Sequence, residues 1–187
     1  MADRYWVGGT ATWDASTTSV WSTTSGGSGG ASVPTSSDDV YFDQAGTFTV
    51  TLGGTGGRNC RSFTVSASTY TFVSASGVVY AYGDVYFVSG TAYPTKLYIN
   101  GTSGFTLTTN GVVVNSIVTG VYANYTLGSA LTCTNNFLGG AGSVLNTSGY
   151  TVTLPTGLSV RNLNMSTSQL ILGGGGNAAL TNPLSIT

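Results

Sequence analysis

The sequence predicts an all-β protein, and it favours a parallel β-solenoid, or β-helix, with an N-terminal β cap; an antiparallel β-sandwich is the alternative. Helix-favouring residues are scarce, because the 187-residue chain contains no Glu and a single Lys, whereas strand-favouring Val and Thr are abundant. Short runs of alternating polar and apolar residues recur between turn signals. Two sequence patterns also recur, and one of them recurs at spacings of roughly one solenoid coil.

The expected strands follow one another at short intervals from residue 47 onward. Thr47–Leu52 alternates strictly between polar and apolar residues, as a strand with one buried face does. The same alternation is found in Ser62–Ser66, Lys96–Asn100, Phe105–Leu107, Leu131–Thr134, Tyr150–Leu154 and Gln169–Leu172. Pairs such as Gly53-Gly54 and Asn110-Gly111 lie between these runs and predict tight turns.

The recurring patterns favour the solenoid over the sandwich. Leu107, Leu131 and Leu158 begin similar short motifs at spacings of 24 and 27 residues. A second type of motif begins at Asn59, Asn115 and Asn162. A period of this length matches coils that stack on one another, although the motifs are degenerate enough to keep the sandwich as an alternative.

The first 46 residues differ in composition from the rest and predict an N-terminal cap or attachment module (1–46), followed by a β-solenoid-like repeat domain (47–187). A solenoid exposes core and strand edges at its ends, which repeat proteins cover with atypical segments. The expected cap residues are Tyr5, Trp6, Trp13, Trp21, Tyr41 and Phe42. Within Ser22–Asp43 we expect only Ser25–Gly30 to form a flexible loop. Gly173–Thr187 has little apolar mass, and we expect a partner chain to cover that end.

Charge is the most unusual feature of the composition. Only 6% of residues are charged, the net charge is −1, and His is absent. A neutral surface favours association, so we expect a homo-oligomer, with a trimer as the favoured state. The five cations are scattered, which argues against nucleic acid as a partner. No apolar run approaches the ~20 residues of a membrane span.

The ionisable residues do not predict an enzyme or a cofactor. Five of the six carboxylates lie within the first 43 residues, so the coils offer no pair for glycoside hydrolysis. Catalytic arrangements that need His are excluded within one chain. Asp38, Asp39 and Asp43 could contribute oxygens to Ca²⁺, but closure of a turn by Ser36, Ser37 and Asp38 is the favoured interpretation, and no metal site is predicted.

Two further groups of residues raise hypotheses about sites. Tyr80, Tyr82 and Tyr86 could share a face and form a carbohydrate-binding platform, although packing against a neighbouring subunit or the core is favoured. Cys60 and Cys133 show no metal-ligand spacing. Two buried free thiols are the favoured interpretation of these cysteines, and a disulfide is the alternative.

The N-terminal motifs RYWVGGTATWD (4–14) and W-STTSGGSGGASVPTSSDDVYFD (21–43) resemble the N-terminal module of structural proteins of tailed bacteriophages. Similar stretches occur in bacterial surface and autotransporter-like proteins. The resemblance implies a non-enzymatic virion or surface component, such as a capsid decoration, fibre or tail-fibre protein, that presents its C-terminal β part outward. It implies capsid or tail proteins, and a host surface glycan, as partners.

The same resemblance leaves two locations open. The sequence starts at Met1 without the pattern of a secretory signal, and unpaired cysteines suit a reducing compartment. We therefore expect a virion protein that assembles in the host cytoplasm, with the bacterial cell surface as the alternative.

Overall fold

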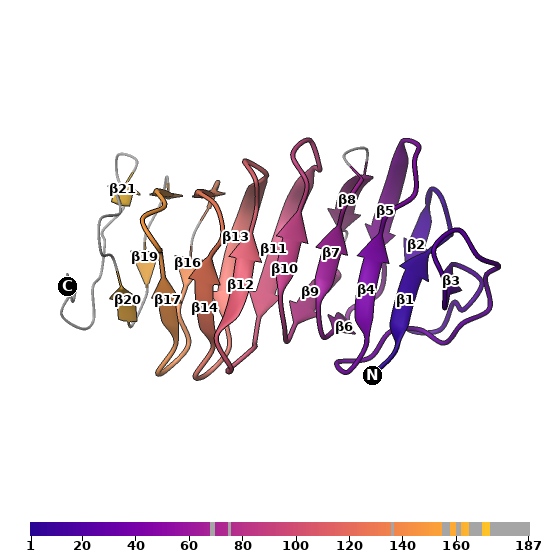
Figure 1. The fold of residues 1–187 in the computed structure, drawn as a ribbon, viewed down its shortest axis with the longest axis horizontal. Helices are drawn as coiled ribbons and strands as arrows, with labels where there is room; N and C mark the ends of the chain where they lie inside the picture. The colour runs from indigo at the N-terminus through magenta and orange to yellow at the C-terminus, as the bar shows by residue number, and fades with distance from the viewer. Residues whose placement is uncertain are drawn as a thin grey trace.

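A computed structural model describes residues 1–67, 70–74, 76–135 and 137–154, together with the backbone of residues 158–159, 162–164 and 170–172. All the regular elements of this part of the chain are β-strands, and all but one of their pairings are parallel. The strands succeed one another along a single long axis, with β1 and β3 towards one end and β20 and β21 towards the other (Figure 1). The predicted parallel β-solenoid is confirmed.

The first sheet contains one strand from each coil and runs the whole length of the described solenoid. Only β3 pairs antiparallel, with β1. In spatial order from the N-terminal end, its strands are β3 (Trp21–Ser22), β1 (Asp3–Trp6), β4 (Asp39–Phe42), β7 (Phe63–Val65), β10 (Val85–Phe87), β12 (Phe105–Thr108), β14 (Asn124–Leu127), β17 (Val144–Asn146) and β20 (Asn162–Asn164).

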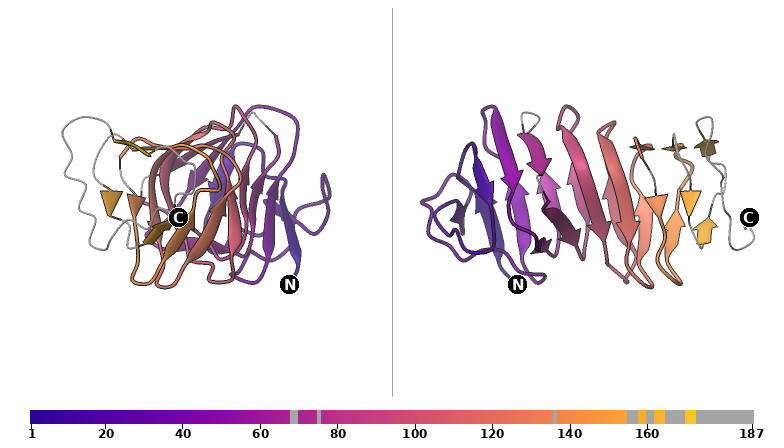
Figure 2. Two further views of the ribbon diagram at one scale, coloured as in Figure 1. Left: turned by 60° about the vertical axis from the view of Figure 1, so that its left-hand side comes forward. Right: turned by 180° about the vertical axis from the view of Figure 1, so that it is seen from behind.

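Two further sheets complete the coils, which Figure 2 shows obliquely and from behind. The second sheet contains β6 (Gly57–Cys60), β9 (Val78–Ala81), β11 (Tyr93–Ile99), β13 (Val113–Thr119), β15 (Leu131–Cys133), β18 (Val152–Leu154) and β21 (Leu170–Leu172), with β16 (Phe137–Leu138) and β19 (Leu158–Ser159) on a side branch. The third sheet contains β2 (Ala11–Trp13), β5 (Phe48–Leu52) and β8 (Tyr70–Ser74).

The register measures the coil length directly. Val40 pairs with Phe63 and Phe63 with Val85, which gives spacings of 23 and 22 residues. Towards the C-terminal end Tyr125 pairs with Leu145, and Leu145 with Leu163, which gives 20 and 18. The coils therefore become shorter along the chain.

The third sheet ends at β8, one coil before the shortening, since Val85 still pairs with Leu107 at a spacing of 22 residues. The coil that starts with β4 continues through β5 and β6, whereas β10 is followed directly by the seven-residue strand β11. An isolated parallel bridge joins Thr71 of β8 to Ala92, the residue before β11. A β-bulge between Tyr93 and Lys96 marks where β11 bends.

The recurring motifs do not occupy equivalent positions in successive coils, so the predicted recurrences are wrong. Leu107 lies in β12 of the first sheet, whereas Leu131 lies in β15 of the second. Asn59 and Asn115 lie in the second sheet and Asn162 in the first. Every strand with one buried face has the same polar–apolar alternation, so the motifs identify strands without identifying the sheet to which each strand belongs.

Inward-facing residues of successive coils stack into one apolar core. Val40, Phe63, Val85 and Leu107 follow one another in register, and all four are buried. Their neighbours along each strand point outward, as the two-residue period of a strand requires. A buried hydroxyl, that of Tyr125, donates to the carbonyl of Gly83 at 2.9 Å and so ties different coils together.

The N-terminal region is continuous with the rest of the solenoid. β1 and β4 extend the first sheet, and β2 and β5 pair in the third sheet. The predicted boundary between residues 46 and 47 therefore falls within a coil, between β4 and β5. The first 46 residues differ in composition but share the core of the coils that follow.

The glycine-rich segment Ser22–Asp43 is held by backbone hydrogen bonds. Gly30 N donates to the carbonyls of Thr18 and Trp21, each at 3.0 Å, and Ala31 N donates to Trp21 O at 3.0 Å. Inside the stretch expected to be flexible, Gly27 N donates to Thr24 O at 3.1 Å. The carbonyls that accept these hydrogen bonds belong to residues outside Ser25–Gly30. The composition of Ser25–Gly30 therefore could not indicate that the loop is held.

We predict that Phe42→Ala destabilises the protein by about 3–5 kcal/mol, because Phe42 is fully buried and its removal leaves a cavity. Chemical denaturation followed by circular dichroism measures the change. Val121→Ala is the matched control, since Val121 is 58% exposed, and its expected effect is below about 0.5 kcal/mol. Equal effects of the two substitutions would contradict the prediction.

Candidate functional site

Four of the six predicted cap residues form an aromatic cluster inside the first coils. Trp6, Trp13, Trp21 and Phe42 are fully buried. The Trp21 ring packs edge-on against Trp6 and Trp13, with 5.1 Å between ring centroids in both cases. Trp6 Nε1 donates to Gly9 O at 2.9 Å. These rings fill the N-terminal end of the core, where a preceding coil would otherwise be needed.

The remaining two cap residues lie on the outer face of the first sheet. Tyr5 and Tyr41 are paired in register and their rings stack at 4.8 Å with an interplanar angle of 17°. In the same outward column, Tyr41 pairs with Thr64 and Thr64 with Tyr86. The column, Tyr5–Tyr41–Thr64–Tyr86, thus carries three tyrosines along the solenoid axis.

The structure does not form the predicted platform of Tyr80, Tyr82 and Tyr86. Tyr80 lies on β9 of the second sheet, where its ring packs against Tyr98 at 4.6 Å, whereas Tyr86 lies on β10 of the first sheet. Tyr82 lies at the corner between these strands and lines a pocket. The prediction is wrong because the chain changes sheet between β9 and β10, so alternation along the sequence does not place the three rings on one face.

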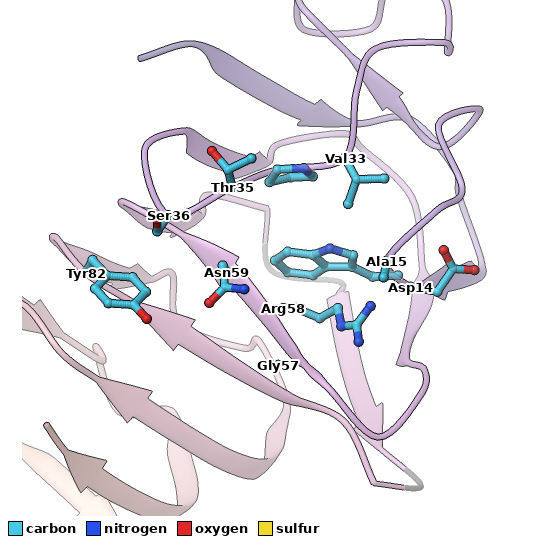
Figure 3. Close-up of a pocket in the computed structure, with 11 residues that line it drawn as sticks. Asp14, Ala15, Val33, Thr35, Ser36, Gly57, Arg58, Asn59 and Tyr82 are labelled. Carbon is cyan, nitrogen blue, oxygen red and sulfur yellow. The ribbon is translucent and has the colours of Figure 1, made fainter.

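This pocket, which we call the Arg58 pocket, lies at the N-terminal edge of the second sheet (Figure 3). It has a volume of about 440 Å³. Its lining residues are Trp13 of β2, Asp14 and Ala15 directly after β2, Val33, Pro34, Thr35 and Ser36 from the loop before β4, Gly57, Arg58 and Asn59 of β6, and Tyr82. Neither the composition nor the strand pattern indicated this cavity.

Arg58 is the charged residue of β6 that faces this pocket. It pairs in register with the buried Val79, so it occupies an inward position, and it is only 4% exposed. Its Nη2 donates to Gly56 O at 2.8 Å, whereas Nε is buried without a hydrogen-bond partner among the described residues.

The carboxylates predicted as possible Ca²⁺ ligands have structural partners. Asp38 Oδ2 accepts hydrogen bonds from Thr35 N at 3.0 Å and Thr35 Oγ1 at 2.7 Å, which confirms its predicted role in a turn. Asp39 forms an ion pair with Arg61. Among the described residues, no three Asp or Cys side chains gather in a group that could hold a metal ion.

Asp14 closes a second turn, directly after β2. Its Oδ1 accepts from Ser16 N at 2.8 Å and Thr17 N at 2.6 Å, and its Oδ2 accepts from Thr17 Oγ1 at 2.7 Å. The hydrogen bonds from Ser16 and then from Thr17 stabilise the carboxylate and lower the pKa of Asp14 to about 2.

Cys60 and Cys133 are free and buried, as predicted. Burial raises the pKa of both thiols, that of Cys133 to about 12. Each side chain points into the core, Cys60 beside Ala81 and Cys133 beside Val114 in register. Thiolate, the reactive form, is therefore suppressed at both positions.

Comparisons of the chain with protein-family models, with curated proteins and with solved structures found no match. In the part of the chain that the structure describes, no helix is long and apolar enough to cross a membrane.

We predict that neither cysteine reacts with a thiol-specific reagent at pH 8 in the native protein, because both sulfurs are buried and protonated. Absorbance from the released chromophore measures the reaction, and both thiols should react at once in denaturant. Rapid reaction of either thiol without denaturant would contradict the burial described.

We predict that Asp14→Ala destabilises the protein by roughly 1 kcal/mol at pH 6, since the carboxylate accepts several hydrogen bonds but is partly exposed. The pKa is lower in the folded state than its ordinary 3.8, so the stabilisation is present above pH 4 and is lost as the pH falls toward 2. Unfolding free energies measured across this range should therefore converge for the two proteins. A difference that stays constant down to pH 2 would contradict this assignment.

Proposed function

We propose that the chain is a non-enzymatic structural component of a tailed-phage particle, which self-associates as a trimer and attaches to capsid or tail proteins. The proposal is supported mainly by the neutral outer surface of a stacked solenoid whose N-terminal end is closed. The chain has only eleven charged residues, five cationic and six acidic, and Asp14, Asp38 and Asp39 are engaged within turns or an ion pair. The N-terminal motifs that resemble phage structural proteins lie at the closed end.

The tyrosine column on the first sheet is the surface that we assign to self-association. Tyr86 is 38% exposed, and the column contains Tyr41 and Thr64 but no charged residue between Tyr5 and Tyr86. Aromatic residues that carry a polar group are enriched at protein interfaces, whereas charged residues are depleted in the interface core. A contact of this kind depends little on electrostatics and should be insensitive to salt.

A second candidate function is adhesion to a glycan. Tyr5 and Tyr41 stack on each other, so their rings turn edges and hydroxyls outward, which favours hydrogen bonding over the face-on packing of a sugar ring. Within the tyrosine column, structural association is therefore the better-supported function.

The proposed assembly predicts a trimer in sedimentation-velocity experiments on the full chain, with the same distribution at about 0.05 and 0.5 M NaCl. Tyr86→Asp places a charge in the column and should weaken association at least tenfold, about 1.4 kcal/mol. Val113→Asp is the matched control, because Val113 is 43% exposed on the second sheet, and it should leave association unchanged. A protein that stays monomeric at every concentration would overturn the proposal, and mass spectrometry of purified particles tests the location.

A further inference from the structure

The Arg58 pocket occupies a position where the coil pattern is incomplete. The first sheet extends beyond β4 through β1 and β3, but the second sheet begins with β6. In place of a strand beside β6, the loop containing Val33, Thr35 and Ser36 passes over the edge and leaves a cavity (Figure 3). β6 is therefore an edge strand with a hollow beside it.

The cavity contains a buried cation that lacks a counter-ion. All six side-chain carboxylates lie within the described residues, and the one ion pair found there joins Arg61 to Asp39. Arg58 is 4% exposed, with one hydrogen bond from Nη2 and none from Nε. A guanidinium is charged at every physiological pH, and burying a charge without a partner is unfavourable.

Asp14 lines the same pocket but does not neutralise Arg58. Its oxygens accept hydrogen bonds from Ser16 and Thr17, which hold the carboxylate in its own turn, and it forms no ion pair with Arg58. In Figure 3 the Arg58 side chain extends from β6 in the direction of Ala15 and Asp14. The guanidinium thus retains donors for an anion that enters from outside.

The other lining groups indicate what carries that anion. Ser36 and Asn59 supply a hydroxyl and an amide group, and Tyr82 adds an aromatic ring with a hydroxyl, whereas the Thr35 hydroxyl already donates to Asp38. Polar groups of this kind bind the hydroxyls of a sugar, and aromatic or apolar walls pack against its C–H faces. A planar guanidinium is suited to two parallel hydrogen bonds with a carboxylate.

We propose that the Arg58 pocket binds a carboxylate-bearing pyranose, that is, a hexuronate unit of an acidic glycan. The Arg58 guanidinium pairs with the carboxylate, and Ser36 and Asn59 bind the ring hydroxyls. The cavity volume of about 440 Å³ lies in the range of small-molecule sites. This assignment stands independently of the assembly proposed above, because the tyrosine column and the pocket are on different sheets.

A second copy of this chain is a poor source of the carboxylate. Glu is absent, and Asp14, Asp38 and Asp39 are held by intramolecular hydrogen bonds or an ion pair. Asp84 Oδ1 accepts from Thr106 N at 2.8 Å. Few carboxylates therefore remain to reach the pocket of a neighbouring copy.

The test is an NMR titration of the full chain with sodium glucuronate, in which the ¹H–¹⁵N signal of Arg58 Nε is followed. We expect a saturable shift of this signal, because the unpartnered Nε–H gains an acceptor. Glucose, which lacks the carboxylate, and sodium chloride should not reproduce it. No saturable shift with glucuronate would overturn the proposal, and so would equal or tighter binding of N-acetylaspartate amide, which carries the carboxylate without a sugar ring.

Three variants sharpen the test. Arg58→Met removes the charge at similar volume, and it should weaken glucuronate binding at least about tenfold while the melting temperature stays the same or rises. Asp14→Asn keeps an acceptor for the turn and removes a repelling charge, so it should tighten binding. Lys96→Met is the control on the outer face of the second sheet and should bind as the unaltered protein does. Undiminished binding by Arg58→Met, measured by calorimetry, would overturn the proposal.

Discussion

Closure of the apolar core at its N-terminal end is the constraint on which the rest of the structure depends. Parallel coils bury their inward residues only against neighbouring coils, so the first coil needs a cover. Phe42 lies among Trp6, Trp13 and Trp21, with ring centroids 5.5, 5.8 and 6.0 Å away. Aromatic rings supply large buried area and favourable edge-to-face contacts, which lets a short segment replace a missing coil.

The same closure creates the pocket. The chain leaves β2, loops through β3 and returns to β4 before a strand beside β6 can form. In a regular coil the inward side chain of Arg58 would stack on an inward residue of the preceding coil, but no strand precedes β6 in its sheet, and Arg58 borders a cavity. The atypical cap that protects the core thus also leaves a buried cation with free hydrogen-bonding capacity.

The few charged side chains of this protein include several with a defined structural role. Asp14 and Asp38 hold turns through local hydrogen bonds, and Asp39 pairs with Arg61 between adjacent coils. The outer strand faces are left to Thr, Asn and Tyr, whose contacts with a partner would be short-ranged and weakly screened by salt. Such a surface favours association through shape and hydrogen bonding.

The sequence by itself determined the all-β class and strands close to β5, β7, β12, β15, β18 and β21. It favoured the parallel solenoid over a sandwich, a turn at Asp38 over a metal site, and free cysteines over a disulfide. These features depend on local alternation, turn chemistry and spacing, which are present in the sequence. Only the tertiary structure decided the coil lengths, the separation of Tyr80 from Tyr86 and the exposure of Arg58 to a cavity. Each of these features depends on the residue at which the chain turns from one sheet to the next. Moving such a turn along the sequence changes which residues become neighbours, but it leaves the polar–apolar alternation of the strands unchanged.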